Sequence, residues 1–521
     1  MDGERPGGSA ASRAPARAQQ LGSFLQPYFL ITIDAPAPPE LSSARFSLRE
    51  VVDAFQTHGH FPTFLHEFTH YLQSTSTANG FAQLTSLQIL AITARDIHGL
   101  IYRMRRDGWA APAEPPLGDW LRHRFPPDTT AEHRAQRDRL LERYEHVVAR
   151  HTWHAGIPLG AAAVRGAMEV APVELGLPPC ASIVPAATKV IAPRLVVEQT
   201  PGQGAAFVLG STDVREGMSR AIELCAACGF DRNAALLELS RQSVALFQAR
   251  RSDAELADHV PYYALFYLFL NHLTGARQHL TLDVFVALCE LALVYQAHGE
   301  SASLTFLAMV QALAADPAAV PVLDPAAPRA FCDAIARIAL AMPLEQRLAV
   351  SIDGMRQFWL AEDPRTAKIA SLIPQFGTTV GAAYEYRMSR LDAPLLFLDL
   401  LAPASMAALV TRFLDNMFIA FADQSFPFFT KPDAIGHHIS RIALVHFLLE
   451  SFSQPHTRCF FQDHADWHMC GYLEEGTICD SRWPRPAPAA PHPCPYMGFL
   501  DQLDAPLVPL RSSSTTPRAG K

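Results

Sequence analysis

His66, Glu67 and His70 are the residues whose types and spacing most directly indicate chemistry. They occur in the run FPTFLHEFTHYLQSTSTANGF (61–81), where three residues separate the two histidines. On an α-helix, residues four apart lie about 40° apart in projection, so both imidazoles project to one side and can bind one metal ion. Glu67 lies one step around the helix, where its carboxylate can reach a water at the metal rather than the metal itself. The pattern is typical of metal-assisted hydrolysis, with zinc as the expected ion.

The residues around this pattern predict that the run is helical. Pro62 suits a first helical turn, and Asn79-Gly80 suits a C-terminal stop. Four apolar residues fall within about a 60° arc on the side roughly opposite the histidines: Phe61, Leu65, Phe68 and Leu72. We therefore expect one face to pack and the other to bind metal. The competing interpretation is a half-exposed helix with ordinary polar histidines.

The sequence LHEFTHYLQSTST (65–77) resembles the metal-binding helix of zincin metallopeptidases, and more narrowly the HEYxHFLQ-type helix of some bacterial proteins. The resemblance is strong over this helix and weak elsewhere. It implies a peptidase-like fold around Zn²⁺, with His66 and His70 as ligands and Glu67 as general base. Position 76, where the metzincin pattern has a further histidine, is Ser76. This departure points toward the gluzincin type, in which a glutamate on a second helix completes the site.

Glu216, in LGSTDVREGMSRAIELC (209–225), is the preferred third ligand. Ser211, Thr212 or Asp213 can cap a helix there. The polar residues that then share one helical face are Glu216, Ser219, Arg220 and Glu223. The run resembles the gluzincin glutamate helix, which implies that Glu216 binds the metal and that Glu223 supports a ligand histidine. A capping or solvated glutamate is the competing interpretation of Glu216. The rival ligands are Glu169, His98 and Glu223 itself.

Other groups of residues bear on the site less directly. A tyrosine or histidine should stabilise the oxyanion of such a reaction, and the candidates are Tyr262, Tyr263, Tyr384 and Tyr386. Aromatic residues in helical regions are more often part of the core. Near the C-terminus, a second metal site is conceivable but matches no known zinc module; its residues are Cys459, His464, His468, Cys470 and Cys479. Cys225 and Cys228 form CAAC late in a helical run, which favours free thiols over a redox pair.

Composition limits the class of protein. Of the 521 residues, 49% are hydrophobic and 18% charged, which indicates a folded globular chain. A formal net charge of −8 argues against nucleic acid as the main ligand. Apolar stretches are too short or too interrupted to predict a membrane span. An odd number of cysteines, nine, in a large chain is not the pattern of a disulfide-stapled domain, so a cytoplasmic location is expected.

The predicted fold is mainly α, with a few short strands in a zincin-like N-terminal region and a helical C-terminal lobe. PYFLITID (27–34) predicts a strand, and LVVEQT (195–200) with AAFVLG (205–210) predicts a strand pair. Helical periodicity dominates from residue 231 onward. The regions expected are a disordered tail at 1–22, a metal-site region at 23–230 with an insertion at about 107–135, a helical lobe at 231–478, and a Pro-rich, loop-like segment at 479–521.

The function expected from these observations is a zinc-dependent hydrolase. The resemblance implies a metallopeptidase that acts on a peptide or protein, with no nucleic-acid partner and an unknown oligomeric state. The alternative is a non-catalytic helical scaffold or binding protein with a structural or degenerate zinc site.

Overall fold

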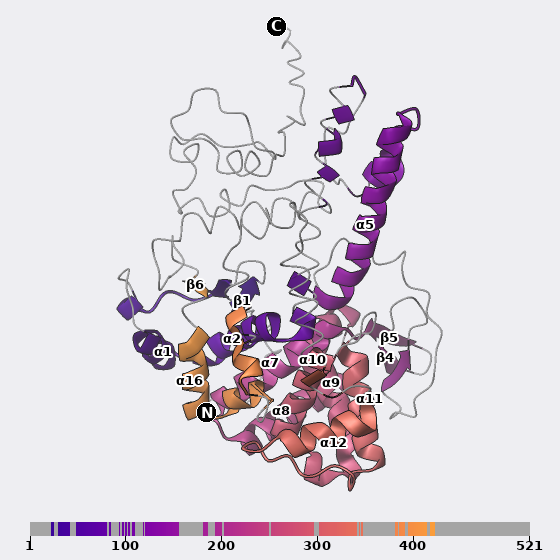
Figure 1. Cartoon of the computed structure of the whole chain (residues 1–521). Helices are drawn as coiled ribbons and strands as arrows, with labels where there is room; N and C mark the ends of the chain where they lie inside the picture. The colour runs from indigo at the N-terminus through magenta and orange to yellow at the C-terminus, as the bar shows by residue number, and fades with distance from the viewer. Residues whose placement is uncertain are drawn as a thin grey trace, which may run out of the picture.

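The protein is mainly α-helical, as the sequence predicts (Figure 1). The computed structural model describes residues 22–25, 30–41, 48–80, 120–155, 181–185, 193–200, 203–248, 252–295, 302–340, 385–390, 394–413 and 417–421, with isolated positions at 83–118 and 343–383. The longer helices are α1 (Leu48–Thr57), α2 (Phe61–Ser76), α5 (Ala131–Ala155), α7 (Ser211–Ala227), α8 (Arg232–Gln248), α9 (Asp253–His272), α10 (Leu282–Tyr295), α11 (Ala302–Ala315), α12 (Arg329–Ala339) and α16 (Pro403–Phe413). The short helices are η2 (Pro39–Leu41), the π-helical η3 (Trp120–Arg124), η4 (Leu273–Gly275), η5 (Arg277–His279) and η6 (Phe397–Leu401).

Two small sheets accompany the helices. Strand β2 (Leu30–Ile33) pairs antiparallel with β1 (Gly22–Leu25) and parallel with β6 (Phe418–Phe421). The second sheet is antiparallel, in the order β3 (Ala181–Pro185), β4 (Pro193–Thr200) and β5 (Gln203–Val208). The predicted strand at 27–34 and the predicted pair at 195–210 are therefore confirmed.

One predicted helix is wrong in its C-terminal part, where the structure has a strand. The periodicity of SMAALVTRFLDNMFIAFA (405–422) predicts a continuous helix, but α16 ends at Phe413 and FIAF forms β6. A short apolar run fits a buried helix and a buried strand equally well by pattern alone. Pairing with the edge of β2 satisfies the backbone of FIAF.

Helix α2 is the interior element that carries the predicted motif. It packs against α7, and α7 packs in turn against α8, α9 and α10 (Figure 1). Every residue from Phe64 to Ser76 is buried, so the histidine face of α2 is covered as well as its apolar face. Pro62 lies in the first turn, as predicted, because the missing N–H of proline has no acceptor there.

The end of α2 differs from the prediction. The helix stops at Ser76, and Thr77 is extended (φ −122°, ψ 155°) before the chain turns helical again at 78–80. Asn79-Gly80 is therefore not the stop. Gly80 has another role, because a Cβ there would lie 2.3 Å from the backbone oxygen of Gln73 and 2.4 Å from that of Ser74. At Gly80 the backbone therefore lies so close to the C-terminal turn of α2 that only glycine fits.

Helix α7 begins where the sequence predicts a cap. Its first residue is Ser211, and Oδ2 of Asp213 accepts a hydrogen bond from the Gly210 N–H at 2.6 Å. An acidic side chain in the first turn also interacts favourably with the helix dipole.

The predicted insertion at 107–135 is partly helical. It includes η3, and its C-terminal end belongs to α5, which begins at Ala131. The buried hydrophobic residues between Ile31 and Phe421 form one core cluster. This cluster contains residues of α7, which belongs to the predicted metal-site region, and residues of α8 to α12, which belong to the predicted helical lobe. The division into regions stays a prediction, and the segments 1–21 and 422–521 lie outside the described residues. Among the described helices, none is long and apolar enough to cross a membrane.

Candidate metal centre

The two imidazoles of α2 face each other across one turn of the helix. Their Nε2 atoms lie 3.2 Å apart, and the ring centroids lie 4.9 Å apart with the planes at 74°. His66 and His70 retain only 8% and 7% of their accessible surface. Unlike surface histidines, these two rings need specific partners for every nitrogen.

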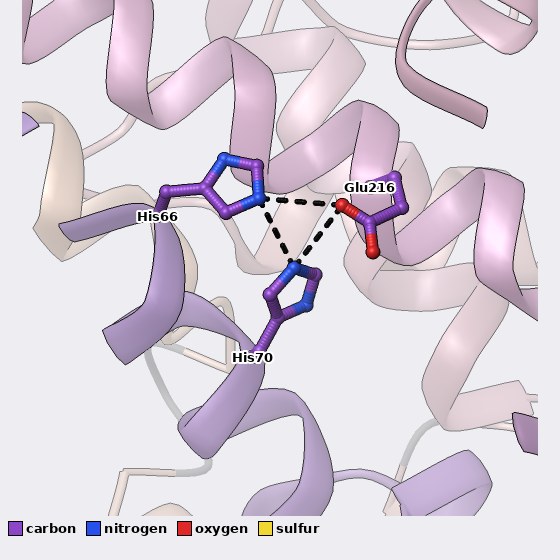
Figure 2. Close-up of side chains that lie close together, drawn as sticks. All are labelled: His66, His70 and Glu216. Atoms are coloured by element: carbon purple, nitrogen blue, oxygen red, sulfur yellow. Dashed lines mark hydrogen bonds and ion pairs between the residues drawn. The ribbon is translucent and has the colours of Figure 1, made fainter. Parts of the chain in front are cut away.

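Glu216 of α7 meets both rings, as Figure 2 shows. Its Oε2 atom lies 3.2 Å from Nε2 of His66 and 3.2 Å from Nε2 of His70. The structure therefore brings together the three residues proposed as metal ligands. Within the described part of the chain, this is the group of His, Cys, Asp and Glu side chains with the spacing to hold an ion.

The outer nitrogen of His66 is held by Glu223. Nδ1 of His66 lies 3.0 Å from Oε2 of Glu223, and the other oxygen of that carboxylate pairs with Arg220 at 2.9 Å. Because a carboxylate paired with arginine is an acceptor, Nδ1 of His66 carries the proton. The supporting role that the resemblance implies for Glu223 agrees with this contact.

The outer nitrogen of His70 is held by Gln73. Nδ1 of His70 lies 2.9 Å from Oε1 of Gln73, which also accepts a bond from Nε of Arg215 at 3.1 Å. The amide nitrogen of Gln73 donates to the backbone oxygen of Arg215 at 3.0 Å. These bonds fix which end of the amide faces His70, so Nδ1 of His70 must donate.

Because both Nδ1 atoms donate outward, the two Nε2 atoms and Oε2 of Glu216 are left facing one another. Their mutual repulsion is relieved when positive charge, from a proton or from a metal ion, lies between them. The three atoms lie 3.2 Å apart, a spacing at which one metal ion can contact all of them at about 2.1 Å with near-tetrahedral angles of about 100°.

The close approach of the histidines and glutamates also shifts their pKa values. Burial opposes protonation of His66, but its hydrogen bonds to Glu216 and Glu223 outweigh burial and raise its pKa to about 10. Burial also acts on Glu216, yet the charges and hydrogen bonds of His70 and His66 lower its pKa well below the usual range. The carboxylates around His66 therefore stabilise positive charge at this position.

Glu67 lies beside the cluster but outside the triangle. It is 5% exposed, and its carboxylate interacts electrostatically with both histidines and with Glu216 and Glu223. Burial raises its pKa above the usual value, although the two histidines act in the opposite direction. A carboxylate with a raised pKa is a stronger base once it is ionised.

Of the candidate tyrosines that the structure describes, Tyr262 of α9 is the one with a ring contact to a histidine of the cluster. Its ring centroid is 6.2 Å from that of His66. Burial and the charges of Glu216, Glu67 and Glu223 raise its pKa, so the phenol keeps its proton. Tyr263 instead donates to Gln242 at 2.7 Å.

Among the described residues, Tyr386, Cys225 and Cys228 are not members of the His66, His70 and Glu216 cluster. Tyr386 packs against Phe413, with ring centroids 5.6 Å apart. Cys225 and Cys228 are free thiols, as predicted, and burial raises the pKa of Cys225 to about 11. The candidates that lie outside the described residues are His98, Glu169, Tyr384, Cys459, His464, His468, Cys470 and Cys479.

Sequence reasoning missed two residues at the site, Gln73 and Arg215. Gln73 follows His70 by three positions, so helical spacing alone places its amide on the same face. Arg215 carries no such signal, because only the packing of α7 on α2 brings it to Gln73. Comparisons with protein-family models, curated proteins and solved structures found no match.

Proposed function

We propose that this protein is a zinc-dependent hydrolase in which His66, His70 and Glu216 bind the metal and Glu67 is the general base. One observation carries the proposal: two buried imidazole nitrogens and a carboxylate oxygen lie within 4.8 Å of one another, next to the further buried carboxylate of Glu67. Three protein ligands with one position left for water or substrate is the ligand number of catalytic zinc sites, whereas structural sites use four.

The residues of the chain divide the chemistry among them. When bound at such a site, zinc acidifies water and polarises a carbonyl group. Glu67 accepts the proton, for which its raised pKa suits it, and can then deliver that proton to a leaving amine. Tyr262 keeps its phenolic proton and can donate it in a hydrogen bond to negative charge on the carbonyl oxygen. Glu223 and Gln73 accept the Nδ1 protons of His66 and His70 and so fix the orientation of the two rings.

Peptides are the proposed substrates. This step rests on the resemblance of the motif helix to metallopeptidases, because the described residues contain no feature that selects one acyl compound over another. The proposed reaction is hydrolysis of an amide bond.

The first experiment is metal analysis of the purified protein and of His66→Ala. We expect about one zinc ion per wild-type chain and a large loss in the variant. The second experiment is hydrolysis of a mixed peptide library by wild type and by Glu67→Gln. We expect Glu67→Gln to retain zinc and fold but to lose turnover, since the amide cannot accept the proton. Zinc without hydrolysis in wild type would support the non-catalytic alternative.

A further inference from the structure

We infer that Gln73 and Arg215 act as a positioning pair, which holds His70 in the tautomer and orientation that metal binding needs. The inference rests on the proposed metal site and extends it to two residues that do not touch the ion.

Gln73 and Arg215 are joined by hydrogen bonds in both directions. The Gln73 amide nitrogen donates to the Arg215 backbone oxygen at 3.0 Å, and Arg215 Nε donates to Gln73 Oε1 at 3.1 Å. Arg215 directly precedes Glu216, and Gln73 lies one turn beyond His70. The pair therefore ties the helix of the second histidine to the helix of the carboxylate, immediately beside both ligands.

The hydrogen-bonding capacity of the Gln73 oxygen is fully used. One lone pair accepts from Arg215 Nε, and the other accepts from Nδ1 of His70 at 2.9 Å. If the amide turned over, its NH₂ group would face two donors and the Arg215 backbone oxygen would lose its partner. The orientation is thus enforced, and the lone pair of His70 must be on Nε2, toward Glu216.

Arg215 is an unusual choice for a purely structural contact. It is 8% exposed, and its other hydrogen bonds go to neutral groups, Ser74 Oγ at 3.0 Å and Gln83 Oε1 at 2.6 Å. Arginine side chains stay charged at neutral pH in proteins. The hydrogen bonds of this buried guanidinium go to neutral oxygens, and the nearby charge of Glu216 offsets part of the cost of its burial. A charged donor makes a stronger bond to Oε1 than a neutral donor would, and so opposes turning of the amide.

The test compares two buried glutamines that both bind Arg215. Gln73→Met removes the contact with His70, whereas Gln83→Met makes the same change at a residue that contacts Arg215 but not His70. Zinc affinity is measured by competition with a chromophoric chelator, and geometry by the visible spectrum of the Co²⁺-substituted protein. We expect Gln73→Met to weaken zinc binding by about 10–100-fold and to alter the Co²⁺ spectrum, and Gln83→Met to change neither by much.

Two further variants separate positioning from folding. Gln73→Glu keeps an oxygen acceptor for His70 Nδ1 and Arg215 Nε but loses the hydrogen bond to the Arg215 backbone oxygen, so it should recover only part of the affinity that Gln73→Met loses. Arg215→Met should weaken zinc binding although the Gln73 side chain is intact. Wild-type affinity in Gln73→Met, or an equal loss in Gln83→Met, would overturn the inference and leave the hydrolase proposal standing. Failure of wild type to bind zinc would overturn both, and zinc binding without hydrolysis would overturn only the hydrolase proposal.

Discussion

Glu223 binds the edge of the His66 ring that faces away from Glu216. Oε2 of Glu223 lies 3.0 Å from Nδ1, and Oε2 of Glu216 lies 3.2 Å from Nε2 of the same imidazole. The two glutamates are two turns apart on one face of α7, so side chains of a single helix contact both nitrogens of the His66 ring.

The first prediction concerns the contact between Glu223 and Nδ1 of His66. Glu223→Ala should lower zinc affinity by about 10–100-fold, because the ring loses its fixed tautomer and orientation. Glu223→Gln should lose less, since an amide oxygen can still accept the proton of Nδ1. Glu238→Ala, on α8 and paired with Arg241, is the control. Chelator competition gives the affinities, and equal binding by Glu223→Ala and wild type would contradict the prediction.

Zinc uptake should release a proton from His66. Its pKa is raised to about 10, so the metal-free ring is protonated at neutral pH, whereas a ligand ring must be neutral. Affinity should therefore rise by about tenfold per pH unit between pH 7 and pH 9. Calorimetric titration in buffers of different ionisation enthalpy measures the protons released. A value near zero at pH 7 would show that His66 is already neutral.

Tyr262→Phe should reduce turnover of a peptide substrate by about 100-fold with little change in KM, because the phenol acts on charge that develops during reaction. The neighbouring variant Tyr263→Phe is the matched control, since its hydroxyl is bound to Gln242. Steady-state kinetics decide between them. Similar losses in the two variants would assign the effect to packing of α9.

A buried ion pair away from the metal centre should dominate local stability. Arg387 Nη1 lies 2.7 Å from Glu290 Oε1, with side chains 1% and 0% exposed. Arg387→Met should destabilise the protein by about 3–5 kcal/mol, because it leaves a buried carboxylate without its counter-charge. The double variant with Glu290→Leu should recover part of this loss, but not all, since Glu290 also accepts the N–H groups of Leu396 and Phe397. Urea unfolding measures both, and a loss under about 1 kcal/mol for Arg387→Met would contradict the prediction.

The parts of the molecule predicted from sequence are those governed by local rules. The spacing of His66 and His70 predicts their approach because both lie on one helix. The capping residues before Glu216 predict α7, and one face of that helix carries both glutamates of the site. The competing interpretation, a half-exposed helix, does not hold, because residues 64–76 of α2 are buried and α7 packs against the helix.

The parts that sequence could not predict depend on contacts between distant segments. Arg215 meets Gln73 across 142 positions, and Arg387 meets Glu290 only once the helices have packed. Strand β6 exists because β2 offers it an edge, a condition that the run FIAF does not encode by itself.

Gly80 shows how a residue without a side chain can govern the chemistry of others. The carbonyl oxygen nearest to it belongs to Gln73, whose amide in turn faces His70. A Cβ at this position cannot be accommodated unless the backbone of Gln73 or of Gly80 moves. We therefore expect Gly80→Ala to disturb the candidate site through the main chain alone, with every charged side chain and every proposed ligand left in the sequence.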